Sequence, residues 1–267
     1  MFIRRKVINL NQKILNKLIY RIAEVSCKAE EGHVPSALSI LDIVWVIYNN
    51  FINIDLIKNS SKKRDIFILS KGHGCLAQYV VLEEKKIFSK KILDSFCKYN
   101  SKFGGHPDAN KIKGIECSTG SLGHGFPFAA GMAYGNKLLK INSKIISIVG
   151  DGECNEGSIW ETCLIASHHK LNNLICIIDK NKSTDRALKI DNLIKKFDSF
   201  GWKCVEINGH SHSEIIRALS LKSEKPVAIV ANTIKGKGIK FMENNPEWHH
   251  KNINKELLEK IKLDILK

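Results

Sequence analysis

The chain has 267 residues, and its 42 Lys and Arg outnumber its 27 Asp and Glu, which gives a formal net charge of +15. A folded chain of this length buries about 75% of its unfolded surface, so it needs no disulfide or metal to hold it together. Its 43% of hydrophobic residues exclude a disordered chain, and no apolar run approaches the roughly 20 residues of a membrane span, so we expect no membrane association.

The first predicted element is a helix over residues 12–31. Residues 1–23 contain basic residues and no acid, a composition that resembles an organellar targeting segment. The same stretch carries an apolar stripe at helical spacing, which favours an ordinary first helix; the stripe is Ile14, Leu15, Leu18, Ile19 and Ile22. Because the stripe continues toward Val25, we interpret the segment as part of the folded domain.

After this helix, apolar runs alternate with helical patterns. The runs are rich in Val, Ile and Leu without alternation, which is typical of parallel strands covered on both faces; they are 66–70, 144–149, 174–179, 203–207 and 227–231. Helical patterns cover 36–51, 74–86, 89–99, 122–140, 156–171, 192–200, 212–222 and 254–265. This order predicts a doubly wound α/β fold, with a mainly parallel sheet and helices on both faces. We predict one domain over residues 1–267, with its ligand site beyond the carboxyl ends of the strands.

The charge and the cysteines point to an ordinary intracellular protein. Only six of the 42 basic residues are Arg, 7% of residues are aromatic and no recognition motif is visible, so we expect no nucleic-acid partner. The eight cysteines include no CxxC pair, which leaves a zinc site without support. With no recognisable signal peptide, we expect a cytoplasmic location.

The most informative stretch is a buried strand that ends in Gly150-Asp151-Gly152, just before a helix. Glycines let the backbone approach an anion closely, and a helix start offers unpaired N–H groups. The next strand ends before Asn181, with 28 residues between Gly152 and Asn181, so a parallel βαβ unit brings Asp151 and Asn181 to one sheet edge. Both could be ordinary turn residues, but Asp, Asn and carbonyl oxygens together with diphosphate oxygens approach the octahedral shell that Mg²⁺ demands. The spacing therefore favours a metal–diphosphate site.

These residues resemble the thiamine-diphosphate fingerprint, and the similarity extends along the chain. Residues 150–179, GDGECNEGSIWETCLIASHHKLNNLICIID, resemble the N-terminal subunit of a split transketolase. Other similar motifs follow in the family's order: EGHVPSALSILDIVWVIY (31–48), LSKGHGCLAQY (69–79), GGHPD (104–108), CSTGSLGHGFPFAAGMAYG (117–135), INGHS (207–211), TIKGKGI (233–239) and FMENNPEWHH (241–250). The resemblance covers about residues 12–250.

The resemblance implies a site for thiamine diphosphate and Mg²⁺, with Ca²⁺ or Mn²⁺ as substitutes. The implied metal ligands are the side chains of Asp151 and Asn181 and the carbonyl of Ser183. The family usually has an apolar residue at that last position, within a stretch like DNNKLQIDG, whereas residues 179–187 read DKNKSTDRA. Further cofactor contacts are implied for Gly150, Gly152 and His73 at the diphosphate, for Gly120 and Leu122 at the aminopyrimidine, and for Glu156 in an acidic network between subunits.

The implied catalytic residues are His33, His106 and His249, which match histidines that contact the sugar's hydroxyls and the reacting carbon, together with Glu156. Histidines exchange protons near pH 7, which suits this chemistry. The remaining histidines that we considered are expected to be surface or hydrogen-bonded core residues: His168, His169, His210, His212 and His250. His250 replaces what is usually a glycine in the family.

The implied reaction transfers a two-carbon ketol unit from a ketose phosphate to an aldose phosphate. In this family the cofactor lies between two domains, and the second domain, which binds the pyrimidine, has no counterpart in these 267 residues. We therefore expect a separate C-terminal subunit, with two copies of each chain in a heterotetramer, and sugar phosphates as substrates.

Two alternatives remain open within this cofactor class. One is a subunit of another thiamine-diphosphate enzyme, similar to 1-deoxyxylulose-5-phosphate synthase or to a 2-oxo-acid dehydrogenase. The other is a degenerate subunit retained for assembly, which the altered 182–187 loop suggests.

Overall fold

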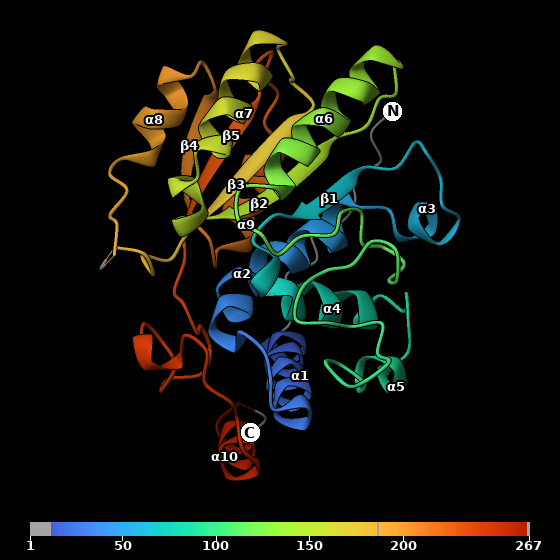
Figure 1. Cartoon of the computed structure of the whole chain (residues 1–267), viewed down its shortest axis with the longest axis vertical. Coiled ribbons are helices and arrows are strands. Elements are labelled where there is room, and N and C mark those ends of the chain that lie inside the picture. Colours follow the sequence, from blue (N-terminus) through green and yellow to red (C-terminus); the bar gives the residue numbers. More distant parts are fainter. Residues whose placement is uncertain (1–11, 186, 266–267) are drawn as a thin grey trace.

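A five-stranded parallel sheet forms the centre of the computed structural model, which describes residues 12–185 and 187–265 (Figure 1). The strands are β1 (Ile66–Leu69), β2 (Ile145–Gly150), β3 (Leu174–Lys180), β4 (Lys203–Asn208) and β5 (Val227–Asn232), in the order β1-β2-β3-β5-β4. All neighbouring pairs are parallel, so the carboxyl ends of all five strands lie at the same edge. This confirms the predicted fold class and all five predicted strands.

The two faces of the sheet build two hydrophobic clusters. On β2, Ile146 and Ile148 face one cluster and Ile145 and Val149 face the other, because successive side chains of a strand point to opposite sides. Every residue of β2 is buried, as its mostly apolar sequence, interrupted by Ser147, predicted. The expectation of coverage on both faces is wrong for β4, since β4 lies at the edge of the sheet and its Lys203 and Glu206 remain exposed.

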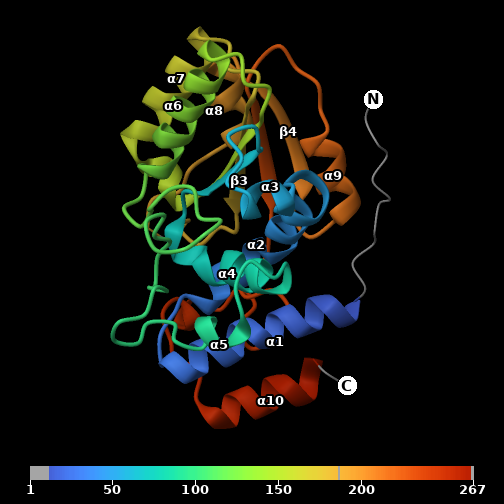
Figure 2. The same cartoon turned by 90° about the vertical axis from the view of Figure 1, so that its right-hand side faces the viewer.

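Helices cover both faces (Figure 2). One face carries α6 (Gly125–Leu138), α7 (Gly157–His168) and α8 (Leu193–Ser199), whereas α2 (Val34–Val46), α4 (Cys75–Glu84) and α9 (His212–Leu219) share the cluster on the other face. Below these, α1 (Gln12–Ala29) packs against α10 (Lys255–Ile265). In α1 the stripe residues Leu18, Ile19 and Ile22 are buried, which confirms the predicted first helix, although it ends at Ala29 rather than at residue 31; residues 1–11 of the basic N-terminal segment lie outside the described residues.

The most apolar helical stretch is Val34–Phe51, formed by α2 and a π-helical turn at Ile47–Phe51. Among the described residues it is the single helix long and apolar enough to cross a membrane, but 83% of it is buried inside the fold. It therefore has the character of a core helix.

Two short segments differ from the predictions. The helix expected over 89–99 is limited to α5 (Lys90–Leu93): the chain continues in turns, with the Phe96 N–H donating to the Leu93 carbonyl, and Cys97 and Asn100 then adopt left-handed backbone conformations that do not continue a helix. The short helix α3 (Ile54–Lys58) was not predicted, although Asn53 caps it by accepting a hydrogen bond from the Asp55 N–H at 3.0 Å.

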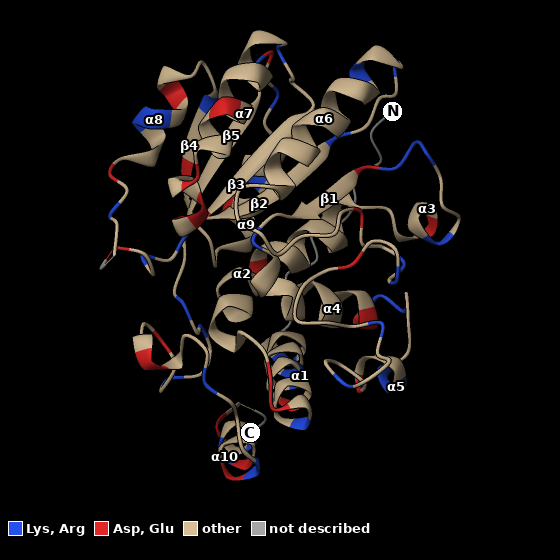
Figure 3. Ribbon diagram, viewed as in Figure 1, with Lys and Arg blue, Asp and Glu red and all other residues tan. Residues whose placement is uncertain are grey.

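The residues coloured as charged in Figure 3 lie mainly on the loops and on the outer helices α1, α8 and α10. The ribbons of α6 and α7 are almost free of charge, with Lys137 and Glu161 as their charged residues. The positive net charge is therefore spread over the periphery of the molecule.

Candidate functional site

The ends of β2 and β3 bring the predicted metal ligands together. Gly150 pairs with Asp179, and the Asp151 N–H donates to the Asp179 carbonyl at 3.1 Å, so the loops after the two strands start side by side. Asp151 accepts hydrogen bonds from the Gly152 N–H at 2.8 Å and the Lys182 N–H at 2.5 Å. The structure thus joins the Gly-Asp-Gly turn to the 181–183 loop, as the βαβ spacing predicted.

Asp151 is a buried carboxylate whose hydrogen-bond donors are backbone N–H groups. Burial, followed by the nearby charge of Asp179, raises its pKa above the usual range. The Asn181 amide oxygen lies in the same network, where it accepts from the Ser183 N–H at 3.0 Å. One carboxylate, one amide and the loop carbonyls form a set of hard oxygen donors that a cation such as Mg²⁺ prefers. The described residues contain no cluster of three or more His, Cys, Asp or Glu arranged for a metal, and the expected site needs only one of them.

A buried Lys71–Asp179 ion pair lies directly beneath this edge, and sequence reasoning missed it. Lys71 Nζ lies 2.5 Å from Asp179 Oδ2, with the two side chains 1% and 0% exposed. Ser39, Thr233 and Asn181 also donate to Asp179. Burial alone would raise the pKa of Asp179, but the charge and hydrogen bond of Lys71 outweigh it and hold that pKa below its usual value. Because the Asn181 side chain donates to the Asp179 carboxylate at 2.8 Å, the ion pair holds that side chain in place.

A second missed residue is Glu153, which is 1% exposed. Its carboxylate accepts from the Ser70 hydroxyl at 2.5 Å, the Gly123 N–H at 3.0 Å and the Gly150 N–H at 3.1 Å. Burial raises its pKa. Glu153 therefore ties the ends of β1 and β2 to the 117–124 loop. The sequence signal was its place directly after Gly-Asp-Gly, where an acidic residue in a buried turn needs several donors.

Three predicted histidines gather near this edge. His33 precedes α2, His73 lies in the turn before α4, and His249 follows the Pro246–Trp248 turn. The His33 ring centre lies 5.5 Å from that of His73 and 5.9 Å from that of His249, and the His33 Nδ1–H donates to the His249 carbonyl at 3.3 Å. Burial lowers the pKa of His33, and burial followed by the charge of Lys71 lowers the pKa of His73 to about 2.

Lys235 was not predicted from the sequence. Its Nζ lies 3.0 Å from His249 Nδ1, and as an ammonium it donates, which leaves the His249 proton on Nε2. Burial, then the charge of Lys71, lowers the pKa of Lys235 to about 8. Burial, then the charge of Lys235, lowers the pKa of His249. The Thr-Ile-Lys-Gly motif that carries Lys235 was the signal available in the sequence.

His106 lines the same hollow as His33 and lies beside the 117–124 loop. A Cβ added at Gly120 would lie 3.2 Å from the His106 ring, and Gly120 has a φ of +155°, so the position suits glycine. The Leu122 carbonyl accepts from His124 Nδ1 at 3.0 Å. Glu156 is exposed at the start of α7. Its side chain faces solvent rather than the histidine cluster.

Of the other histidines, His210 and His212 both lie 2.8 Å from the buried Asp42 of α2. Burial would raise the pKa of Asp42, but the hydrogen bonds from the two histidines lower it. These are hydrogen-bonded core histidines, as expected. His250 is an exposed residue, as expected; it contacts Glu31 and also lines a hollow with a volume of about 510 Å³ beside His33 and His106.

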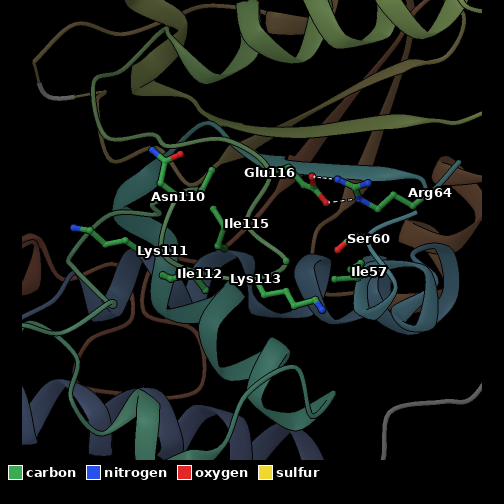
Figure 4. Close-up of a pocket in the computed structure, with 11 residues that line it drawn as sticks. Ile57, Ser60, Arg64, Asn110, Lys111, Ile112, Lys113, Ile115 and Glu116 are labelled. Carbon is green, nitrogen blue, oxygen red and sulfur yellow. Dashed lines mark hydrogen bonds and ion pairs between the residues drawn. The ribbon is translucent and has the colours of Figure 1, made fainter. Parts of the chain in front are cut away.

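A separate hollow of about 360 Å³ lies between α3 and residues 109–116 (Figure 4). Its Arg64 forms a two-pronged ion pair with Glu116, with N–O distances of 2.7 and 2.5 Å, and Lys113 donates to the Lys58 carbonyl. None of the predicted site residues lines it. The candidate site is therefore the carboxyl edge of the sheet with the hollow beside His33.

This arrangement defines a doubly wound α/β protein with its polar site beyond the carboxyl ends of the strands. The family model described as "Transketolase, thiamine diphosphate binding domain" matches residues 11–265. The chain belongs to this family of thiamine-diphosphate-binding transketolase domains, as the sequence motifs predicted.

The chain is similar both to proteins that it covers over most of their length and to longer transketolases. One subunit of the apulose-4-phosphate transketolase of Phocaeicola vulgatus is 36% identical, over 86% of this chain and 84% of its own. The 6-deoxy-6-sulfo-D-fructose transketolase subunit SqwG of a Clostridium species is also 36% identical, over 85% of each. Human transketolase is 34% identical over 92% of this chain but only 40% of its own length.

Solved structures of transketolases have the same fold as this chain. The transketolase of Campylobacter jejuni superposes with a TM-score of 0.86 at 30% identity, covering 95% of this chain and 42% of that one. The chain thus spans about two fifths of the length of the solved transketolases that it matches.

Proposed function

We propose that this chain is the cofactor-binding subunit of a two-component transketolase, and that it transfers a two-carbon ketol unit together with a separate pyrimidine-binding subunit. One observation carries the proposal. The chain matches relatives that are named as transketolase subunits over most of both lengths, whereas it matches only about two fifths of single-chain transketolases. Its polar edge supplies groups for a metal and a diphosphate from this chain alone.

In the proposed site, Asp151, Asn181 and the Ser183 carbonyl would hold Mg²⁺. The Gly152 backbone, His73 and Lys235 would face the diphosphate, and Gly120 and Leu122 would face the pyrimidine. When bound, thiamine diphosphate supplies the carbanion and the electron sink needed to break a carbon–carbon bond beside a carbonyl. The residues of the chain bind and orient the substrate and move protons.

His33 and His249 are suited to accept protons, because burial lowers the pKa of both and keeps them neutral at pH 7. The ammonium of Lys235 further fixes the His249 proton on Nε2. With His106, these rings would contact the hydroxyl and carbonyl oxygens of the sugar, and such proton transfers contribute about 10²–10⁴-fold each.

The partner would cover an exposed apolar face on α6 and α7. Leu138 and Leu164 are 64% and 61% exposed there, with Phe128 and Ile165 also exposed. Small residues leave room on the same helices, since an added Cβ at Gly131, Gly135 or Gly157 would meet nothing within 4 Å. Glu156, at the start of α7, borders this face. A face of this kind marks a protein interface, and we assign it to the pyrimidine-binding subunit, with two copies of each chain in the assembly.

The substrate class follows from the relatives. Their names describe a sugar with a phosphate and a sugar with a sulfo group, so the proposed donor is a ketose with an anionic terminal group. The basic periphery would attract such anions.

The test is reconstitution. The purified chain alone should transfer no ketol unit from fructose 6-phosphate to an aldose phosphate, and adding the pyrimidine-binding subunit with thiamine diphosphate and Mg²⁺ should produce transfer. Robust transfer by the chain alone would contradict the two-component proposal. Activity with pyruvate but not with fructose 6-phosphate would favour another enzyme of this cofactor class, and failure to bind the cofactor in the assembly would favour a degenerate subunit.

A further inference from the structure

Glu31 and His250 form an ion pair at the rim of the hollow that contains His33. Glu31 lies in the turn between α1 and α2, and His250 follows His249. Glu31 Oε1 lies 2.8 Å from His250 Nε2 and also accepts from the Gly32 N–H at 2.9 Å. The pair therefore connects the turn that carries His33 to a loop 219 residues away in the sequence.

The same loop contacts His33 twice. The His250 ring centre lies 4.6 Å from that of His33, with the ring planes inclined by 55°. From the backbone, the His249 carbonyl accepts from His33 Nδ1. With Nδ1 engaged and one side covered by His250, the His33 ring has a fixed orientation that depends on where the loop lies. Glu31 holds the loop in that place.

Several charged or titratable groups surround His33. They are Glu31 on its own turn, His73 from the turn before α4, His106 from the 104–106 loop, and His249 and His250 from the C-terminal segment. Burial is the largest cause of the lowered pKa of His33, and among the neighbouring charges His250 acts in the same direction.

We propose that Glu31 and His250 are positioning residues, whose ion pair closes the loop after Trp248 onto the turn before α2 and holds the His33 ring toward the substrate hollow. The inference rests on the proposed function, in which His33 contacts the sugar. It also assigns a structural role to His250, a position at which the family usually has a glycine.

The first test uses the full chain alone and needs no cofactor. In NMR spectra of histidine-labelled protein, the rings of His33 and His250 should show a mutual nuclear Overhauser effect. Glu31→Ala should abolish it, whereas Glu30→Ala, at an exposed neighbour, should leave it intact. In a pH titration, His250→Gln should raise the pKa of His33, because the glutamine keeps a donor for Glu31 but removes the charge. His168→Gln, at the end of α7, is the matched control.

The second test uses the reconstituted complex. Glu31→Ala and His250→Ala should each lower kcat/KM about two- to fivefold, the size expected for a half-exposed ion pair, and the double variant should lose no more than either single variant. In His250→Gln the acid limb of the pH profile should move to higher pH, since His33 must be neutral and would protonate at higher pH. A merely structural role would leave that limb in place.

The outcomes separate the two proposals. An unchanged His33 titration in His250→Gln, or additive losses in the double variant, would overturn the positioning role. Absence of ketol transfer by the unaltered complex would instead overturn the proposed function, while the ring contact and the titration in the chain alone would still decide whether the pair holds His33.

Discussion

Replacing Lys71 with Met tests the buried network under the site most directly. The substitution removes the cation but keeps much of the volume of the side chain, so its main effect is to leave the Asp179 carboxylate unpaired at 0% exposure. Removing one partner of a buried ion pair typically costs about 3–5 kcal/mol. Ser39, Thr233 and Asn181 still donate to Asp179. We therefore expect a loss near the lower end of that range, about 3 kcal/mol.

The double variant Lys71→Met with Asp179→Asn should recover part of this loss. An asparagine at 179 carries no charge, its oxygen can accept from Ser39 and Asn181, and its NH₂ group can donate to the Thr233 hydroxyl, which accepts as well as donates. Burying neutral groups whose hydrogen bonds are satisfied costs far less free energy than burying a lone charge.

The effect of pH has a defined sign. Lys71 holds the pKa of Asp179 below its usual value, so the stability that this carboxylate contributes is present at neutral pH and is lost as the pH falls through the folded pKa. In Lys71→Met, burial is no longer offset and Asp179 takes up a proton at higher pH. The stability difference between the two proteins should therefore be largest near pH 7 and shrink toward about pH 4, close to the pKa of an unfolded aspartate.

Urea unfolding followed by circular dichroism measures these differences. Lys17→Met is the matched control, because Lys17 and Glu84 are a similar 2.7 Å apart but 63% and 29% exposed, and an exposed pair is worth about 1 kcal/mol or less. Lys71→Met should destabilise the protein more than Lys17→Met does. If it does not, or if the stability difference between Lys71→Met and the unaltered protein does not shrink at acid pH, Lys71 does not stabilise the Asp179 carboxylate as described.

Three further predictions concern the site and its surroundings. Asp151→Asn should weaken Mg²⁺-dependent binding of thiamine diphosphate at least tenfold by calorimetry, because it removes the one carboxylate of the donor set, whereas Asp191→Asn, in an exposed ion pair with a lysine, should not. Leu164→Glu should prevent assembly with the pyrimidine-binding subunit in gel filtration without lowering the stability of the chain, while Leu263→Glu, equally exposed on α10, should assemble normally. Lys235→Met should lower diphosphate affinity most below pH 8, since the lysine loses its charge as the pH rises through its pKa of about 8, and an equal loss at pH 9 would refute this role.

The sequence predicted those parts of the fold and site that depend on local patterns. Runs rich in Val, Ile and Leu located all five strands, and the spacing from Gly152 to Asn181 placed two loops side by side because one helix and one strand fill that gap. α5 was predicted too long because the apolar pattern continues past Leu93, whereas the chain there passes into turns and then into the left-handed backbone at Cys97.

What the sequence could not supply were pairings over long separations. Lys71 and Asp179 lie 108 positions apart, and an isolated lysine after a strand is usually a surface residue. Glu153 differs from Glu156 by three positions, yet one is buried with three donors and the other is exposed, which depends on how the 117–124 loop folds over the turn. Likewise, the position of His250 beside His33 depends on how a distant loop returns to the turn before α2.

Glu153 also has a thermodynamic consequence. Its carboxylate connects the segments at Ser70, Gly123 and Gly150 through hydrogen bonds that the chain makes with its own groups. A cofactor that enters this site therefore meets loops that are already ordered, and little of its binding free energy is spent on immobilising backbone. The heat-capacity change of binding should then match the surface that the cofactor itself buries, with no added contribution from loop folding.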